Sequence, residues 1–534
     1  MKRIIKIFIF LLAVFLIEGC SKNPGKSNSK NEPEDNILRY WFLQDPPNLD
    51  PAHATDTTSA VVVMHIFDGL VDLEPQTLEP VPAIAESWNI SDDGTVYTFH
   101  IRKGVKFHNG REVQAEDFRF SFERTLNPKT KSERTWVLDQ IKGAEERMRG
   151  EADSVEGIKV IDDYTLEVTL KEPLAFFLPL LAMEAASAVP REEVEKWGED
   201  FGLHPVGCGP FVFDSWIRDS KLILKANRNY YGEGPYVDAI RFLIHRQVSQ
   251  ALDLYKAGKL DILTDIPPQK VQMTKKELPE DFLMWEILGT YYLSFNLEKE
   301  PFRDNKKLRQ AFNHAIDKKA ICERLLEGVP YPAKGILPKG LWGYNPDLEG
   351  YEYNIEKAKA LLAEAGYPEG KGLKEIDLWY NTSELHKSLC LLVQDNLREI
   401  GVKVGLKSLD WGPYLDATKD GKTEFCRSGW LADIGDPDNF LYVLLHSKNI
   451  GQGNYSRYKN PEFDALTEQA RRLTNLEERI PLYQQAEKMA VEDAVWVFLY
   501  HYRDCLLRKP YLKNVIQPVQ GDFKIPLEKI KIEN

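Results

Sequence analysis

The sequence predicts a multidomain protein of the α+β or α/β class, and three observations support that prediction. The chain has 534 residues. The part after the N-terminal leader, roughly 500 residues, is too long to fold around a single hydrophobic core. Strand-like and helix-like patterns are interspersed along the chain, and Gly and Pro separate them throughout. No repeat of fixed period is present. Two or three domains of mixed structure are therefore expected.

The clearest local signals are two strands and three helical segments. Residues 95–102 and 163–170 alternate apolar and polar side chains, as half-buried strands do. A helix is predicted over 354–366, from a cap at Asn354 to a stop at Gly366. Two longer helical segments are also predicted, the second with interruptions: 305–327, and 462–492 broken near Asn475 and Pro481.

The N-terminus has the features of an export signal. A positive start precedes an apolar run over 7–17, which is too short to cross a membrane. The run ends in Ile17-Glu18-Gly19-Cys20, which resembles the lipobox of bacterial lipoproteins, although Glu18 departs from the small residue usual there. We therefore expect a signal peptide over 1–19, lipidation of Cys20 and a flexible tether over 20–37. The alternative is ordinary secretion with an incidental cysteine.

Composition narrows the possible functions. The net charge of −13 argues against nucleic acid or an anionic membrane surface as a partner. The six cysteines include no CxxC pair, so neither a zinc site nor a disulfide scaffold is indicated, and most are expected to be small buried residues. Catalytic and phosphate-binding signatures (GxSxG, HExxH, GxxxxGK[ST], GxGxxG) are absent from the sequence. The chain is predicted to bind a ligand without being an enzyme, and no cofactor or metal is expected.

An ordered set of motifs identifies a family resemblance. Residues 83–128 are similar to the signature region of the extracellular solute-binding proteins that serve peptide ABC importers, family 5 of that group. Further motifs follow in the family's order: VIDDYTLEVTLKEP, VGCGPF, RNYYGEGP, YKAGKLDI, PFRDNKKLRQAFNHAID, AKALLAEAGYP, YNTSELHK and GWLADIGDPDNF. The resemblance covers residues 38–534 and is closest to the oligopeptide-binding lipoproteins.

The resemblance implies an α/β, periplasmic-binding-protein-like fold with two lobes, a hinge and three domains (the large, type II-like architecture). Domain I would consist of 38–67, 188–288 and 499–534. Domain II would be 68–187, and domain III 289–498. The chain would cross between the lobes near 288 and 499, where the hinge is expected.

The resemblance also implies the binding residues. Asp433 matches the aspartate that receives a peptide's α-ammonium, whereas Arg427 and His386 match residues that meet its C-terminal carboxylate. The segment Gly429, Trp430 and Leu431 falls where the family pairs a strand with the peptide backbone. Aromatic residues at four positions would line side-chain pockets: Trp411, Trp430, Tyr292 and Tyr502. A lysine that some relatives add near the carboxylate end is Leu326 here, which leaves the preferred peptide length open.

The spacing of the two charges fits this interpretation. Six residues of strand span roughly 20 Å, at about 3.3 Å each, so Arg427 and Asp433 do not easily neutralise each other. Since buried charges are tolerated only when paired, an extended zwitterionic peptide of about four residues would supply both partners. The alternative is that each charge has a partner within the protein. For His386 alone, a purely structural role is a further alternative.

Peptide capture for an ABC importer is the leading functional hypothesis. The expected partners are short peptides, a membrane-embedded permease, and the membrane through the lipid anchor only, with the body monomeric and located outside the cytoplasm, in the periplasm or at the cell surface. The same fold could instead bind a dipeptide, a murein peptide, a nickel chelate or another small solute such as an oligosaccharide. A hydrolase or a surface adhesin is the alternative from a different class.

Overall fold

The computed structural model describes residues 36–264 and 266–533. The predicted signal peptide, Cys20 and nearly all of the tether therefore lie outside the described residues. From Ile37 onward the chain forms one unit. Among the helices within the two described ranges, none combines the length and apolar composition that a bilayer crossing requires.

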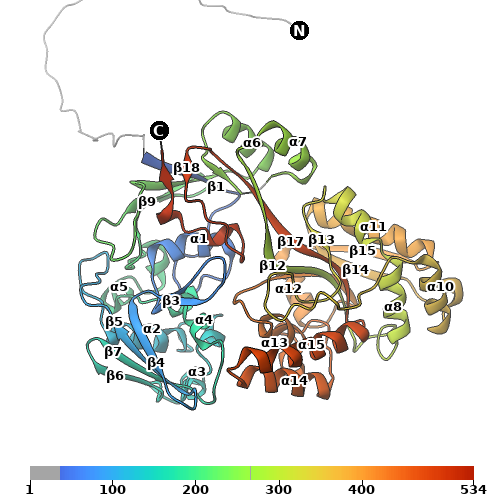
Figure 1. The fold of residues 1–534 in the computed structure, drawn as a ribbon, viewed down its shortest axis with the longest axis horizontal. Coiled ribbons are helices and arrows are strands. Elements are labelled where there is room, and N and C mark those ends of the chain that lie inside the picture. Colours follow the sequence, from blue (N-terminus) through green and yellow to red (C-terminus); the bar gives the residue numbers. More distant parts are fainter. Residues whose placement is uncertain (1–35, 265, 534) are drawn as a thin grey trace, which may run out of the picture. The chain divides into compact units, whose positions relative to one another are not determined.

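A mixed sheet of eleven strands runs through this unit, and Figure 1 shows how its strands connect the two groups of elements on either side. Two long strands, β12 and β17, pair antiparallel at its centre. Along the sheet the order is β15 (Val404–Leu409), β14 (Ile376–Asn381), β16 (Phe425–Leu431), β12 (Phe282–Phe295), β17 (Trp496–Arg508), β11 (Ile262–Leu263), β1 (Ile37–Phe42), β10 (Ala239–Ile244), β9 (Lys221–Ala226) and β8 (Phe211–Ile217), with β13 (Tyr331–Pro332) beside β17.

Three smaller sheets and fifteen α-helices complete the described fold. The sheets are β4 (Ala85–Ile90), β5 (Val96–Ile101), β7 (Thr165–Thr169) and β6 (Ile158–Asp162); β2 (Val71–Leu73) with β3 (Pro80–Pro82); and β18 (Leu512–Lys513) with β19 (Lys531–Ile532). The helices are α1 (Thr57–Ile66), α2 (Ala115–Thr125), α3 (Ala144–Met148), α4 (Phe177–Leu181), α5 (Arg191–Trp197), α6 (Val248–Lys256), α7 (Val271–Glu277), α8 (Lys306–Ala315), α9 (Lys318–Ala320), α10 (Ile355–Glu364), α11 (Glu384–Glu399), α12 (Trp411–Lys419), α13 (Asp438–Leu445), α14 (Pro461–Arg472) and α15 (Leu476–Glu492).

The predicted strands and helices are present with small differences. The predicted strands correspond to β5 and β7, and α10 begins after Asn354, whose side chain accepts a hydrogen bond from the Lys357 amide. The segment 305–327 is not one helix. α8 ends at Ala315, and the short helix α9 begins after its cap, Asp317. The segment 462–492 is broken at Asn475, which caps α15, but Pro481 lies inside α15 without ending it.

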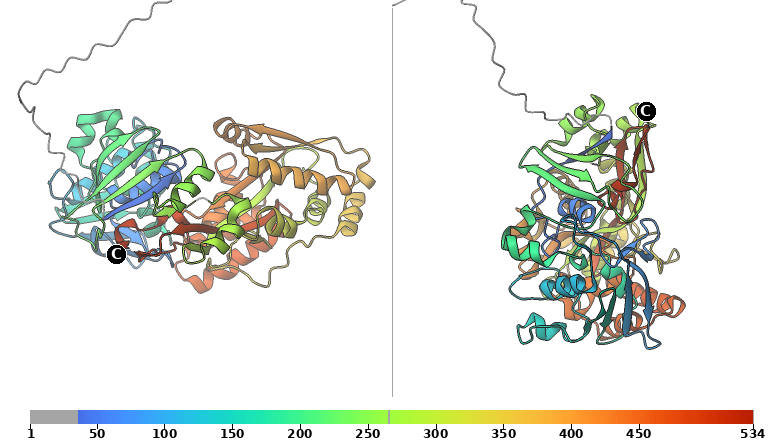
Figure 2. Two further views of the ribbon diagram at one scale, coloured as in Figure 1. Left: turned by 90° about the horizontal axis from the view of Figure 1, so that it is seen from above. Right: turned by 90° about the vertical axis from the view of Figure 1, so that its left-hand side faces the viewer.

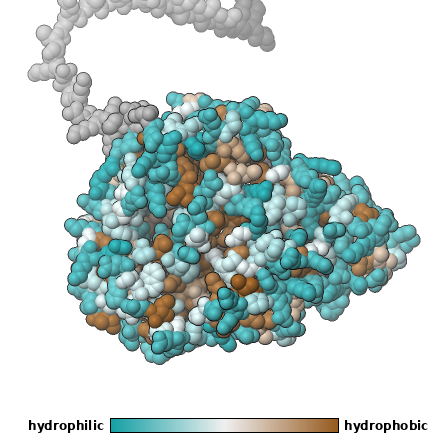
Figure 3. Space-filling view, in the orientation of Figure 1, coloured by the Kyte–Doolittle hydropathy of each residue, from teal (hydrophilic) through white to brown (hydrophobic). Residues whose placement is uncertain are grey.

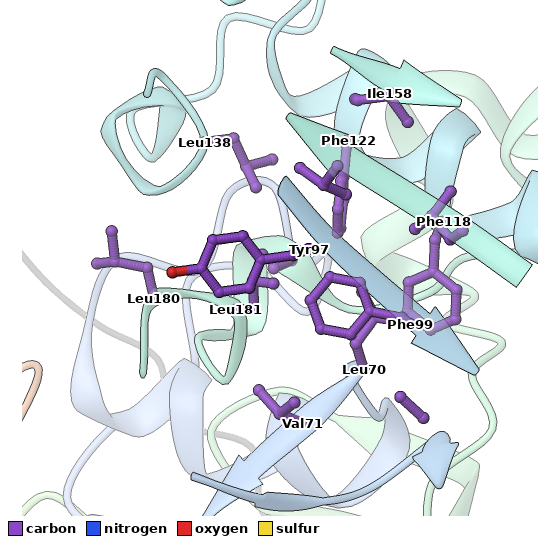
Figure 4. Packing of buried hydrophobic residues seen from close by; sticks show 14 of the residues in the cluster. Leu70, Val71, Tyr97, Phe99, Phe118, Phe122, Leu138, Ile158, Leu180 and Leu181 are labelled. Carbon is purple, nitrogen blue, oxygen red and sulfur yellow. The ribbon is translucent and has the colours of Figure 1, made fainter. Parts of the chain in front are cut away.

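Buried side chains form separate hydrophobic clusters on the two sides of β12 and β17. One cluster lies around β5 and α2, where Figure 4 shows Tyr97 and Phe99 beside Phe118 and Phe122. Another joins β1 to the C-terminal segment, since Leu38 and Leu527 belong to the same cluster. Two more consist mainly of residues 288–500, and Leu78 joins one of them. The predicted boundaries of three domains stay a prediction.

Both β12 and β17 pass from one group of clusters to the other, and the left view of Figure 2 shows the two corresponding parts of the ribbon side by side. The pairing of β12 with β17 shifts register between Glu286 and Thr290. Within this irregular stretch, the Leu288 amide donates to the Val519 carbonyl (2.6 Å), and the Leu288 carbonyl accepts from the Ala432 amide (2.8 Å). The break in pairing therefore joins three chain segments at one place. One of the three segments enters through Ala432, the residue before Asp433.

The surface drawn in Figure 3 is mostly hydrophilic, with hydrophobic residues in small separate groups. Such scattered groups are usual on the surface of a globular protein. Four of the five described cysteines are buried, as predicted, and Cys505 is half-buried.

The buried carboxyl of Glu487 gives a test of how pH affects stability. Its Oε1 accepts hydrogen bonds from the Ile336 and Leu337 amides, both at 2.8 Å, whereas its Oε2 has no partner. Burial raises the pKa of Glu487 to about 7. The folded state thus keeps a proton that the unfolded state loses, so this residue's contribution to stability falls as pH rises from the unfolded value near 4.5 towards 7.

Glu487→Gln is therefore expected to gain stability over the wild type as pH rises from 5 to 8, by an amount on the order of 1–2 kcal/mol. Unfolding by urea, followed at several pH values, measures the difference. Glu477→Gln, at an exposed position of the same helix, is the control and should show no such trend. A gain for Glu487→Gln that is the same at every pH would contradict the assignment.

Candidate functional site

One edge of β16 is open beside the residues predicted to bind. β16 pairs along its whole length with β12, from Phe425 opposite Phe295 to Leu431 opposite Gly289. On its other side it pairs with β14 only at Phe425 and Cys426. From residue 427 to 431 this second edge has no strand beside it in the described chain, and all five residues are partly exposed. An extended peptide could add there as a strand.

Tyr502 lies against the backbone at this edge because two glycines make room for it. A Cβ on Gly429 would lie 2.6 Å from the Tyr502 hydroxyl, and one on Gly289 would lie 2.7 Å from its ring. Neither distance is possible for a real side chain, so both positions need glycine as long as the ring stays there. Tyr502 also packs edge-on against Tyr291, with ring centroids 6.2 Å apart. The predicted residues Gly429 and Tyr502 are thus in direct contact.

Arg427 and His386 meet at one end of the open edge. The Arg427 Nη2 donates to His386 Nε2 at 2.5 Å, and His386 Nδ1 lies 3.0 Å from the Tyr291 hydroxyl. Burial, followed by the charge of Arg427, lowers the pKa of His386 to about 3. The imidazole is therefore neutral, and the network assigns its proton to Nδ1, which donates to Tyr291. Ser383 caps α11 and so places His386 in the helix's first turn.

The Arg427 guanidinium is well enclosed but has no carboxylate partner among the described residues. It lies over the ring of Tyr291, 5.3 Å from the centroid, and over that of Trp411, at 5.9 Å. Its Nε is buried without a hydrogen-bond partner. A guanidinium has five N–H donors, and a neutral imidazole satisfies only one of them. This cation is thus equipped to receive an anion.

Asp433, at the other end of the edge, is a carboxylate that lacks a cation partner among the described residues. It lies two residues beyond the end of β16, and no described cation forms an ion pair with it. Its amide donates to Asn439 Oδ1 (3.0 Å), and Asn439 Nδ2 donates weakly to Asp433 Oδ2 (3.4 Å). The Gln520 side chain donates to the Asp433 carbonyl at 2.8 Å. Burial raises the pKa of Asp433 more than Arg134, Asn439 and Lys524 lower it.

Asp433 borders a cavity of about 280 Å³. Most of the lining comes from residues 64–83, 182–187 and 516–529, which lie far from Asp433 in sequence. The lining contains more carboxylates than ammonium groups, and one of its lysines, Lys524, is already paired with Glu184. The Asp433 end of the open edge therefore faces a polar, net acidic space.

The other predicted residues divide into two sets. Trp430 donates from Nε1 to Asn439 Oδ1 (2.9 Å), and Leu431 borders a second cavity of about 340 Å³. Trp411 is 55% exposed and stacks on Tyr414. These residues lie beside the open edge or its charged ends.

Tyr292 does not join them. It is 2% exposed and stacks on Trp496 with ring centroids 3.6 Å apart, on the opposite face of β12 from Tyr291. The residue that contacts His386 and Arg427 is its neighbour Tyr291, which the sequence interpretation missed, as it missed Asn439 and Gln520. The sequence pattern of β12 does not distinguish Tyr291 from Tyr292, because both lie in a run of buried residues. Asn439 is part of the quoted GDPDNF motif, but the motif alone gave it no role.

Comparisons with known proteins identify the family of this chain. The model of the bacterial extracellular solute-binding proteins, family 5 (middle part), matches residues 79–452. The heme-binding protein A of Haemophilus influenzae is 34% identical over 95% of this chain and 96% of its own. The periplasmic oligopeptide-binding protein OppA of Escherichia coli is 32% identical, with 87% of each chain covered.

A solved structure extends the likeness to three dimensions. The periplasmic binding protein DppA of Helicobacter pylori, in complex with the peptide STSA, superposes with a TM-score of 0.80 at 31% identity, covering 93% of this chain and 98% of that one. Sequence, fold and the matched length all lead to the same assignment. The chain belongs to family 5 of the bacterial extracellular solute-binding proteins.

Proposed function

We propose that this protein captures short oligopeptides in extended form along the open edge of β16 and delivers them to the permease of an ABC importer. One observation carries the proposal. Within the described residues, the half-buried guanidinium of Arg427 at one end of the edge has no carboxylate partner, and the half-buried carboxylate of Asp433 at the other end has no cation partner. Burying an unpaired charge is costly. The carboxylate and ammonium of a zwitterionic peptide are the two missing partners.

The peptide backbone and side chains would meet different parts of the site. Main-chain groups would pair with residues 429–431, which gives affinity independent of peptide sequence. The flanking aromatic residues and cavities would take side chains. Two named relatives support this choice, since one is an oligopeptide-binding protein and the other was solved with a tetrapeptide. Tyr292 is left out of this proposed set.

The location and anchoring of the protein belong to the same proposal. Members of the family act outside the cytoplasm. We assign Cys20 as the lipidated residue and the segment from there to β1, which begins at Ile37, as a tether, so that the body stays near the permease. The body would act as a monomer and would not cleave its peptides.

Mass spectrometry of the ligand that co-purifies with the protein tests the proposal. We expect a mixture of peptides of about three to five residues with free termini, intact after prolonged incubation. The double variant D433A/R427A should release this mixture during purification. A single dipeptide, a murein peptide or a non-peptide solute such as a heme, a nickel chelate or an oligosaccharide would overturn the oligopeptide assignment within the family. Shortened peptides after incubation would indicate a hydrolase.

A further inference from the structure

Asn439 connects the backbone and the carboxylate of Asp433 with the indole of Trp430. It lies in the first turn of α13 and is 2% exposed. Its Oδ1 accepts two hydrogen bonds, from the Asp433 amide (3.0 Å) and from Trp430 Nε1 (2.9 Å). Its Nδ2 donates to Asp433 Oδ2 at 3.4 Å. The side-chain amide of Asn439 thus makes two hydrogen bonds with Asp433, the proposed ammonium site, and one with Trp430.

The hydrogen bonds fix which way the amide points. Both groups facing Oδ1 are N–H donors, so a flipped amide would direct its own NH₂ at two donors and lose both bonds. The unflipped orientation is therefore the only one that satisfies the site. It places the Nδ2 donor on the side of the Asp433 carboxylate.

The start of α13 is itself held firmly. The Asp436 carboxylate pairs with the Arg479 guanidinium, with an N–O distance of 2.8 Å, and both side chains are almost fully buried. The Asp438 carboxylate lies 3.3 Å from Nε of Arg471. These arginines come from α15 and α14, so the two helices anchor the turn from which Asn439 extends. None of these pairs involves the Asp433 carboxylate.

We propose that Asn439 is a positioning residue, which orients the Asp433 carboxylate and favours its ionised form for the α-ammonium of the ligand. A donor aimed at a desolvated carboxylate stabilises the charged form. This inference rests on the proposed function. The charged groups of other elements that affect Asp433 most are Arg134, Glu184 and Lys524. Among the described side chains, Asn439 is the one that donates to the carboxylate.

Asn439→Leu removes every polar atom at similar size and gives the principal test. Calorimetry would compare tetra-alanine with its N-acetylated form, and the ratio of the two affinities reports recognition of the ammonium. We expect the variant to lower the wild-type ratio by about tenfold, as for a lost hydrogen bond to a charged group. Affinity for the acetylated peptide should change less than about threefold.

Asn454→Leu is the matched control. Asn454 is fully buried in the same region of the chain and donates to the Leu445 and Tyr458 carbonyls, each at 2.9 Å. Its loss should lower thermal stability and leave the affinity ratio unchanged. If Asn439→Leu also left the ratio unchanged, with both affinities falling in parallel, Asn439 would be merely structural. A ratio near one in the wild type would instead overturn the assignment of Asp433 itself and this inference with it.

Asn439→Asp provides a second route if the leucine variant does not fold. It keeps the acceptor for Trp430 and for the Asp433 amide but puts a carboxylate oxygen where the donor was. Like charges in contact raise a carboxyl pKa, so the affinity ratio should fall with decreasing pH at a midpoint about one unit above that of the wild type. A pH profile identical to the wild-type profile would overturn the inference.

Discussion

Asp433→Ala is expected to weaken peptide binding by about 2–5 kcal/mol, the range for removing one partner of a buried charge pair. The size of the effect follows from burial. The carboxylate lies at the border of a cavity, and among the described residues it has no cation in contact and receives one weak side-chain hydrogen bond. In the complex the ligand's ammonium would be its main partner. Without the carboxylate, that ammonium is buried unpaired.

A chemical change in the ligand separates this effect from general damage to the protein. An N-acetylated peptide should lose a similar amount of binding free energy with the wild type and little more with the variant. Asp433→Asn, which keeps the shape and removes the charge, should resemble Asp433→Ala. If acetylation weakens binding to the variant as much as to the wild type, Asp433 is not the ammonium site.

The pH dependence of binding has a defined sign. Burial raises the pKa of Asp433 above its usual value, and only the ionised carboxylate pairs with an ammonium. Affinity of the wild type should therefore fall as pH decreases through that raised pKa, whereas the Asp433→Asn variant should lack this fall. Calorimetry between pH 4 and 8 measures the difference.

Local patterns predicted the elements of this fold better than they predicted the site. Asn354 could be assigned as a helix cap from sequence alone. A short polar side chain before an amphipathic helical pattern accepts a hydrogen bond from the first turn, and this contact does not depend on where the helix lies in the fold. Pro481 was harder, because its effect depends on position. It lies in the second turn of α15, where the helix loses one hydrogen bond but continues.

The site depends on contacts between distant residues, which no local pattern specifies. His386 and Arg427 are 41 positions apart, and their hydrogen bond was accessible only through the family resemblance. To choose between Tyr291 and Tyr292, one must know which face of β12 is turned towards His386. The pairing of β12 with β16 and β17 determines that face. Asn439 could not be predicted for a further reason: its proposed role is to orient the side chain of Asp433, and it does not meet the ligand itself.

Arg427→Ala is expected to reduce binding most for one peptide length, about that of a tetrapeptide, by about 2–3 kcal/mol. The guanidinium has a fixed distance from Asp433 because it extends from β16, which is paired with β12 throughout. A peptide whose ammonium is at Asp433 brings its carboxylate to Arg427 only at that length. Longer and shorter peptides would place the carboxylate elsewhere, against other cations or water.

Two comparisons test the prediction that Arg427→Ala affects one peptide length most. Calorimetry with tri-, tetra- and pentapeptides of alanine and of lysine, on wild type and variant, shows whether the loss is confined to one length and whether side chains matter little, as backbone pairing implies. Amidation of the tetrapeptide's C-terminus should weaken binding to the wild type but add little to the loss in the variant.

Arg427→Lys separates charge from geometry. It keeps a positive charge but not the planar fork, which suits a carboxylate and also reaches His386 between the rings of Tyr291 and Trp411. Its loss for the tetrapeptide should therefore lie between those of the wild type and Arg427→Ala. A uniform loss across all lengths in Arg427→Ala would mean that the guanidinium supports the aromatic cluster and His386 without meeting the ligand. The free carboxylate of the peptide would then need another partner in the cavity.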